Sequence, residues 1–439
     1  MRTRYLVLAV AVTLPGGGAA AALSANHPPP RPATVEEIAR PTDELDRLVE
    51  TFERRTEERG GSLEHATLGQ LLLQRAGELA SVSDYEAAAA AYTSAIEIGG
   101  AQVDRLVALG RAELGQHRFA AAADAAARAL ELDPASLDAL ALSGDAAFAQ
   151  GRTDDAATAF DALFAARPDD PAVLVRIAQL DLLRAGPDAG RARADQAVDA
   201  AVQAGLSPAD QAFYRSFAGN MAYELGLYDV AEALLVQATA DAPNDHGALG
   251  ELARVRHATG DVDAAIALLE RANAIVPEPD HLTLLGDLRL LVGDDEGAAD
   301  DHERGLAIAL QDDAHRRAWG RAVIEHDLDH DGDLDRAARL IAAELSERRD
   351  AGGYALEAWL HFRRGDLDAA RTSIDVALEA GFVDAATWFR AGSISAARGE
   401  IDRARTELHA ALDLNPGFAP GSEAEVRTLL GTLDPCPTP

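Results

Sequence analysis

Apolar and small residues recur at helical spacing through most of this 439-residue chain. Alanine and leucine fill long stretches, and the strand-like alternation of Val, Ile and Thr is absent. Phe, Trp and Tyr make up only 5% of the residues, which favours small-residue helix packing over sheet packing. The pattern predicts an all-α fold. A chain of this length is either two or three ordinary domains or a repeat array, and periodicity distinguishes the two.

Turn residues recur with a period close to 34 residues. Pro134 and Pro168 are 34 residues apart, as are Pro243 and Pro277. Such self-similarity is typical of a solenoid, in which each helical hairpin covers the apolar face of the next. The predicted turns lie at Ser83, His117, Gly151, a loosened unit near 186–190, Gly226, Gly260, Gly293, Gly332, Gly365 and Gly399.

The units share an internal pattern. A small residue lies seven positions before most turns, as Gly110 and Gly392 do, and alanines lie five and twelve positions after, as Ala265 and Ala272 do. Residues 260–272 and 365–371 closely resemble the turn and second helix of the tetratricopeptide repeat (TPR), and the resemblance covers about residues 62–420. It implies a right-handed superhelical α-solenoid of about ten TPR hairpins, with residues 422–433 as a C-terminal capping helix.

The resemblance also implies a function. In TPR proteins the first helices of the hairpins line a concave groove that binds extended peptides, so we expect a non-enzymatic scaffold or adaptor. The alternative is that the aromatic members of this set fill the core between repeats. The groove candidates are Arg111, Phe148, Phe213, Asn220, Tyr223, Arg254, His257, Trp359 and Phe362.

The N-terminus is typical of an exported protein. Residues 1–25 combine Arg2 and Arg4, an apolar run and small residues, which predicts a signal peptide or, alternatively, a retained anchor. A proline-rich spacer is expected at 26–41, an N-terminal helix at 42–61, the TPR array at 62–420, and the capping helix with a tail at 421–439. No later segment is apolar enough to span a membrane. We therefore expect a periplasmic, cell-envelope or extracellular protein.

Charge narrows the choice of partner. The net charge is −33, with 73 acidic residues, 40 basic residues and no lysine. Such a surface repels nucleic acid and anionic lipid, and it attracts a basic protein, a basic peptide or a divalent cation. The single cysteine, Cys436, cannot form a disulfide within the chain.

The eighth unit contains an acidic segment. If Gly320 is the packing glycine of this unit, about five residues are inserted before Gly332. Asp327, Asp329, Asp331, Asp333 and Asp335 then match the first nine places of an EF-hand calcium loop, although Ala338 stands where the last carboxylate belongs. The prediction is a weak Ca²⁺ site and a calcium-binding structural module as the alternative function. The competing interpretation is an ordinary solvated turn, since 365–368 repeats the same Gly-Asp-Leu-Asp.

Catalytic motifs are missing from the sequence. There is no His-Glu-x-x-His pair, nucleophile elbow or glycine-rich phosphate loop. His326 and His330, four residues apart, are potential ligands for a transition metal together with the aspartates. A helical-toroid glycosidase is the enzyme alternative, but three tryptophans are few for stacking sugars. No cofactor is required by this interpretation beyond the candidate Ca²⁺.

Overall fold

The computed structural model describes residues 43–433, which are helical apart from turns and short connections and contain no strand. The predicted all-α class is therefore confirmed for these residues. They form two compact units, 43–142 and 143–433, and the division falls inside one helix, where a continuous array was expected. The predicted signal or anchor at 1–25 and the spacer at 26–41 lie outside the described residues.

The first unit begins with a helix after the predicted spacer, expected at 42–61 and found at Asp43–Arg59. Its helices are α1 (Asp43–Arg59), α2 (Ser62–Leu79), α3 (Val82–Gly99), α4 (Val103–Gly115), α5 (Phe119–Leu132) and the first half of α6 (Leu137–Ala149).

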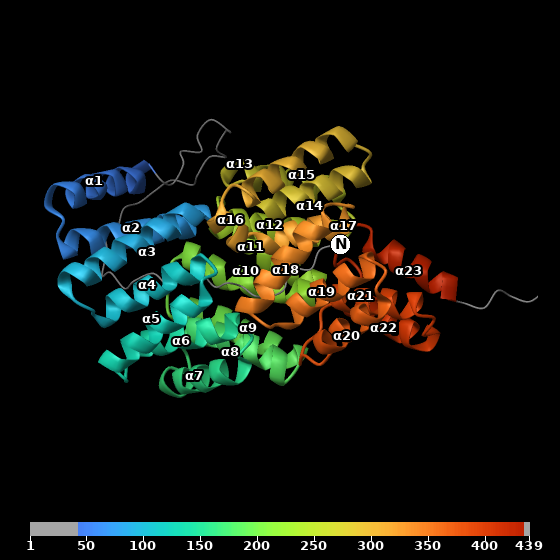
Figure 1. Ribbon diagram of the computed structural model, residues 1–439, viewed down its shortest axis with the longest axis horizontal. Helices are drawn as coiled ribbons and strands as arrows, with labels where there is room; N and C mark the ends of the chain where they lie inside the picture. The colour runs from blue at the N-terminus through green and yellow to red at the C-terminus, as the bar shows by residue number, and fades with distance from the viewer. Residues whose placement is uncertain (1–42, 434–439) are drawn as a thin grey trace, which may run out of the picture. The chain divides into compact units, whose positions relative to one another are not determined.

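The second unit holds the rest of α6 and the remaining helices (Figure 1). These are α7 (Thr153–Ala166), α8 (Pro171–Arg184), α9 (Pro187–Gln203), α10 (Pro208–Glu224), α11 (Tyr228–Asp241), α12 (His246–Ala258), α13 (Val262–Ile275), α14 (Pro279–Leu291), α15 (Asp295–Ala309), α16 (Asp313–Ala318), α17 (Gly320–Asp329), α18 (Leu334–Glu347), α19 (Ala351–Arg363), α20 (Leu367–Leu378), α21 (Ala385–Ala397), α22 (Ile401–Leu414) and α23 (Ser422–Leu433).

Consecutive helices pack in hairpins, and we call the two members the A helix and the B helix. The small residue seven positions before the turn brings them together. Leu235 of α11 fills the space of a Cβ at Gly219, and Leu408 of α22 does the same at Gly392. Any side chain at these glycines would push the two helices apart. The pairs are α2/α3, α4/α5, α8/α9, α10/α11, α12/α13, α14/α15, α17/α18, α19/α20 and α21/α22.

Most predicted turns lie where the sequence places them. A left-handed backbone is found at His117 and at Gly151, Gly226, Gly260, Gly293, Gly365 and Gly399. Two predicted turn residues are wrong: Ala80 adopts this conformation instead of Ser83, which lies inside α3, and Asp331 adopts it instead of Gly332. Aspartates that follow the turn, such as Asp261 and Asp366, accept backbone N–H bonds at the start of the B helix.

The second unit folds back on itself through contacts between residues about 190 to 200 positions apart. The Tyr223 hydroxyl donates to the carbonyl of Gly417 over 2.8 Å, and the side-chain amide of Asn415 donates to the carbonyl of Tyr223 over 2.8 Å. The backbone N–H of Arg349 also donates to the carbonyl of Gln150 over 3.4 Å. Later repeats therefore pack against the turns of earlier ones.

Helix α23 packs on α22 and α21, and its Val426 is fully buried. Its role as a cap stays a prediction. Within residues 43–433, no helix is both long enough and apolar enough to cross a bilayer.

Candidate functional site

Three of the predicted groove residues do not face solvent. Tyr223 is bonded to Gly417, and Trp359 donates its indole N–H to Asp329 over 2.9 Å. The Arg254 guanidinium lies over the Tyr223 ring and pairs with Glu224 at 2.7 Å. Tyr223 belongs to the contact by which the unit folds back on itself, whereas Trp359 and Arg254 join neighbouring hairpins. We correct their assignment from partner contact to internal packing.

The remaining six candidates are partly buried, and their contact with a partner stays a prediction. Phe362 stacks on the Trp359 ring with centroids 4.6 Å apart, and the Asn220 amide oxygen accepts from Arg254 over 3.2 Å. Burial lowers the pKa of His257. The six are Arg111, Phe148, Phe213, Asn220, His257 and Phe362.

Ion pairs about 30 residues apart join neighbouring A helices. Arg176 of α8 holds Asp145 of α6 with two bonds of 2.7 Å, and Arg254 of α12 holds Glu224 of α10. Each is a charge-assisted contact with a buried arginine, the kind of pair that fixes helix position. The sequence reasoning missed them, although the repeated spacing of acidic residue and arginine was visible.

The A helix of the eighth hairpin carries a buried carboxylate. Counted from the left-handed turn residue Asp331, Ile324 occupies the place that Ala253, Gly286 and Ala358 have in other hairpins, and Glu325 follows it directly. Burial raises the pKa of Glu325 to about 8, which the nearby Arg390 only partly offsets. The Arg390 side chain is itself fully buried. The same cause raises the pKa of Glu224 to about 7.

The five extra residues of this unit do not form a loop before Gly332. A Cβ at Gly320 would meet nothing within 4 Å, so Gly320 is not the packing glycine. The added length lies earlier, where the A helix is broken at Trp319 into the short α16 and α17. Asp327 and Asp329 consequently belong to the last turn of α17.

Each of the five aspartates contacts a different partner, and the five do not form a common ion site. Asp327 is fully buried and binds Arg336 at 2.6 and 2.8 Å. Asp333 caps α18, the role that Asp366 has in an ordinary repeat. Asp329 accepts from Trp359, Asp331 pairs with Arg363, and Asp335 pairs with Arg364. Among the described residues, the groups able to share one ion include none of these five. Calcium binding stays an untested prediction, and it would require these contacts to break.

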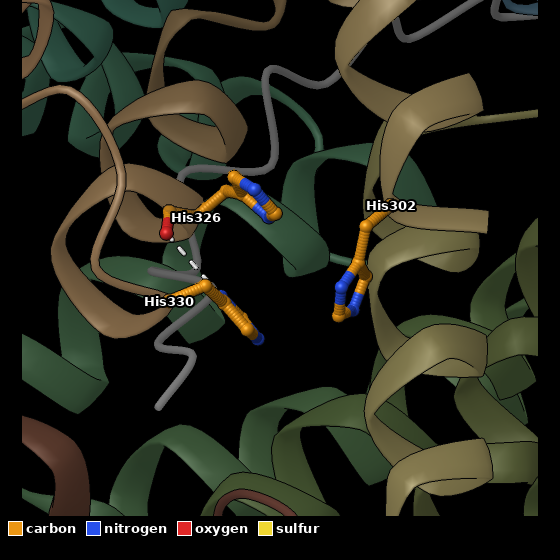
Figure 2. A group of neighbouring side chains, drawn as sticks. All are labelled: His302, His326 and His330. Carbon is orange, nitrogen blue, oxygen red and sulfur yellow. Dashed lines mark hydrogen bonds between the residues drawn. The ribbon is translucent and has the colours of Figure 1, made fainter. Parts of the chain in front are cut away.

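Three histidines converge beside this segment instead (Figure 2). His302 comes from α15, His326 from α17, and His330 from the C-cap of α17. One ring nitrogen of each lies within 4.8 Å of those of the other two. The Nε2 atoms of His302 and His330 are 2.9 and 2.8 Å from the same carboxylate oxygen, Oδ1 of Asp287 on α14. His302 is the member that sequence reasoning missed.

A second cluster combines two histidines and one glutamate. Nδ1 of His246 and Nδ1 of His281 each lie 3.3 Å from a different oxygen of Glu278. His281 is 2% exposed, and its ring fills the space beside Gly250. This cluster joins α12 to α14 through a closed, buried contact.

Stacked two-helix hairpins with small residues between their helices define a helical-repeat protein. Models of the tetratricopeptide repeat match residues 107–171, 222–288 and 355–419. The chain belongs to the tetratricopeptide-repeat family, as its turn and B-helix motifs predict. No curated protein matches it.

Solved structures of similar fold share little sequence with the chain. A tetratricopeptide repeat protein from Parabacteroides merdae ATCC 43184 is 16% identical, covering 58% of this chain and 98% of its own, with a TM-score of 0.40. PilW, a type IV pilus biogenesis factor, is 19% identical, and the match covers 49% of this chain and 96% of PilW with a TM-score of 0.40. Human IFIT1 is 12% identical, and the match covers 86% of this chain and 96% of IFIT1 with a TM-score of 0.46.

Proposed function

We propose that this protein is an exported scaffold that binds a basic protein or peptide in the cell envelope or outside the cell. TPR proteins bind proteins or peptides, and the match to that family is the observation that carries the proposal. The sequence adds the N-terminal signal pattern and the net charge of −33, which attracts a cationic partner. This function needs no catalytic step and no nucleic acid.

The turn between α14 and α15 offers a contact surface outside the A-helix face. Leu290, Leu291 and Val292 are 45%, 51% and 52% exposed, and the exposed acidic residues 294–296 follow directly. Apolar side chains exposed in a run mark interaction surfaces more often than isolated ones do. Next to three carboxylates, this edge would suit a peptide that carries both apolar and arginine or lysine side chains.

Affinity capture with a matched control tests the scaffold. The purified chain, a Leu291→Asp/Val292→Asp variant and a Val376→Asp variant are immobilised and exposed to envelope and secreted proteins. Val376, 42% exposed on α20, is the control for adding charge at an exposed apolar site. We expect a basic partner retained by wild type and by Val376→Asp, lost by the double variant, and weakened by salt. Equal retention by all three chains, or an acidic partner, would contradict the proposal.

Export is tested separately. Residues 1–42 are fused to a reporter that is active only outside the cytoplasm, and a second fusion has Arg2 and Arg4 replaced by glutamate. We expect activity from the first fusion and a marked loss from the second, because signal peptides need a basic start. An inactive first fusion would place the scaffold in the cytoplasm while leaving its partner binding untouched.

A further inference from the structure

Three histidine side chains from two neighbouring hairpins lie close together. The rings of His326 and His330 stack with centroids 4.7 Å apart, and the His302 ring lies edge-on to His330 at 4.6 Å. The three side chains are drawn in Figure 2. Oδ1 of Asp287, on α14, contacts two of these rings, those of His302 and His330. The spacing of four residues brings His326 and His330 together, because one helical turn separates them. Gly286 makes room for the His302 ring, which fills the space of its missing Cβ.

The hydrogen bonds set the orientation of His330. Its Nδ1 faces the carbonyl oxygen of His326 at 3.2 Å, and a carbonyl only accepts. In a neutral ring the proton therefore lies on Nδ1, and Nε2 presents a lone pair. That lone pair faces Oδ1 of Asp287, another acceptor, at 2.8 Å. Two acceptors at this distance repel each other unless a second proton lies between them or a metal ion binds both atoms.

We infer that His302, His326, His330 and Asp287 form a binding site for a divalent transition-metal ion, with Zn²⁺ the best fit. Three imidazoles and one carboxylate provide the four ligands of a tetrahedral zinc site. Imidazole nitrogen suits zinc, whereas calcium and magnesium prefer oxygen. The bond from His330 Nδ1 to a backbone carbonyl is the outer-shell contact that orients histidine ligands in metal proteins.

The site is accessible to an ion and lies at the junction between hairpin α14/α15 and α17, where the A helix is broken. All three histidines are partly exposed, which leaves a path for entry. The ion would join hairpin α14/α15 to α17, across the break at Trp319. At this junction the larger Ile324 stands at the position of the usual small residue, so the two helices cannot approach as closely as elsewhere. With four protein ligands the role would be structural.

Zinc and cobalt titrations of the purified full chain test the inference. Zinc affinity is measured by competition with a chromophoric chelator, and the visible absorption of bound Co²⁺ reports tetrahedral coordination. The variants are His302→Gln and His330→Gln, and the control is His246→Gln in the second cluster. Circular dichroism of each variant verifies that it is folded.

The wild type should bind one Zn²⁺ and show the tetrahedral Co²⁺ spectrum. Each ligand substitution should weaken binding by at least about 10- to 100-fold, since loss of even an outer-shell partner has that effect. His246→Gln should bind as the wild type does, and zinc should raise the Tm of the wild type and of this control only. The absence of saturable binding, equal binding by all variants, or loss in His246→Gln alone would each overturn the assignment.

Discussion

The buried carboxylate of Glu325 makes a testable link between pH and stability. Replacing it by glutamine preserves its shape and removes its ionisation. In the folded chain burial raises the pKa of Glu325 from 4.5 to about 8. The unfolded chain therefore releases this proton at lower pH than the folded chain does. The stability that the protonated group provides is complete below pH 4.5 and is lost as pH rises through 8.

The size of the effect follows from the shift. At about 1.4 kcal/mol per pKa unit, ionisation costs the folded wild type roughly 3 kcal/mol at pH 7 and roughly 5 kcal/mol at pH 9. The Glu325→Gln variant escapes this cost, but it buries an amide that lacks a good partner, at about 1–3 kcal/mol at every pH. The variant should be the less stable protein at pH 5 and the more stable one at pH 9. Between pH 5 and pH 9, the free energy of unfolding of the variant should rise by about 4 kcal/mol relative to that of the wild type.

Urea denaturation followed by circular dichroism at pH 5, 7 and 9 measures this difference. Glu347→Gln, which removes an exposed carboxylate on α18, controls for the change in net charge. Parallel stability curves for Glu325→Gln and wild type would refute the reasoning. They would mean that Arg390 keeps Glu325 ionised in the fold throughout this range.

Further substitutions test the packing and the ion pairs. Gly286→Ala would press a Cβ against an imidazole and should cost about 1–3 kcal/mol in thermal unfolding, whereas Gly320→Ala, in open space, should be neutral or stabilise by up to about 1 kcal/mol. Arg254→Met should cost about 3–5 kcal/mol by leaving Glu224 buried alone, and adding Glu224→Gln should recover part of it in urea. Asp327→Asn should cost about 2–3 kcal/mol by calorimetry, because it weakens a buried charge-assisted pair.

Locally encoded features could be predicted from the sequence. The bounds of α1 and the turn at Gly226 follow from helix breakers and from a backbone conformation that glycine adopts readily. The small residues at Gly219 and Gly392 revealed which faces of the helices meet. These signals act within one hairpin, so the spacing of residues along the chain is enough to read them.

Contacts between distant repeats could not be predicted in this way. Tyr223 looked like a groove residue because its position on an A helix is correct, yet its hydroxyl is bonded 194 residues away. Whether a stack closes on itself depends on small rotations that accumulate over many hairpins. Insertions raise a similar problem. Spacing showed that the eighth unit is longer, but it could not show whether the added residues lie near Gly332 or near Trp319.

The two proposed sites share one helix, which makes them thermodynamically dependent. Asp287 lies on α14, three residues before the exposed run at 290–292. A metal ion held by Asp287 would fix the end of α14 and reduce the entropy lost when a partner orders this edge. By linkage, zinc should then tighten partner binding by the same factor by which the partner tightens zinc binding. If partner affinity is identical with zinc and with chelator, the ion stabilises the repeat stack alone and has no part in recognition.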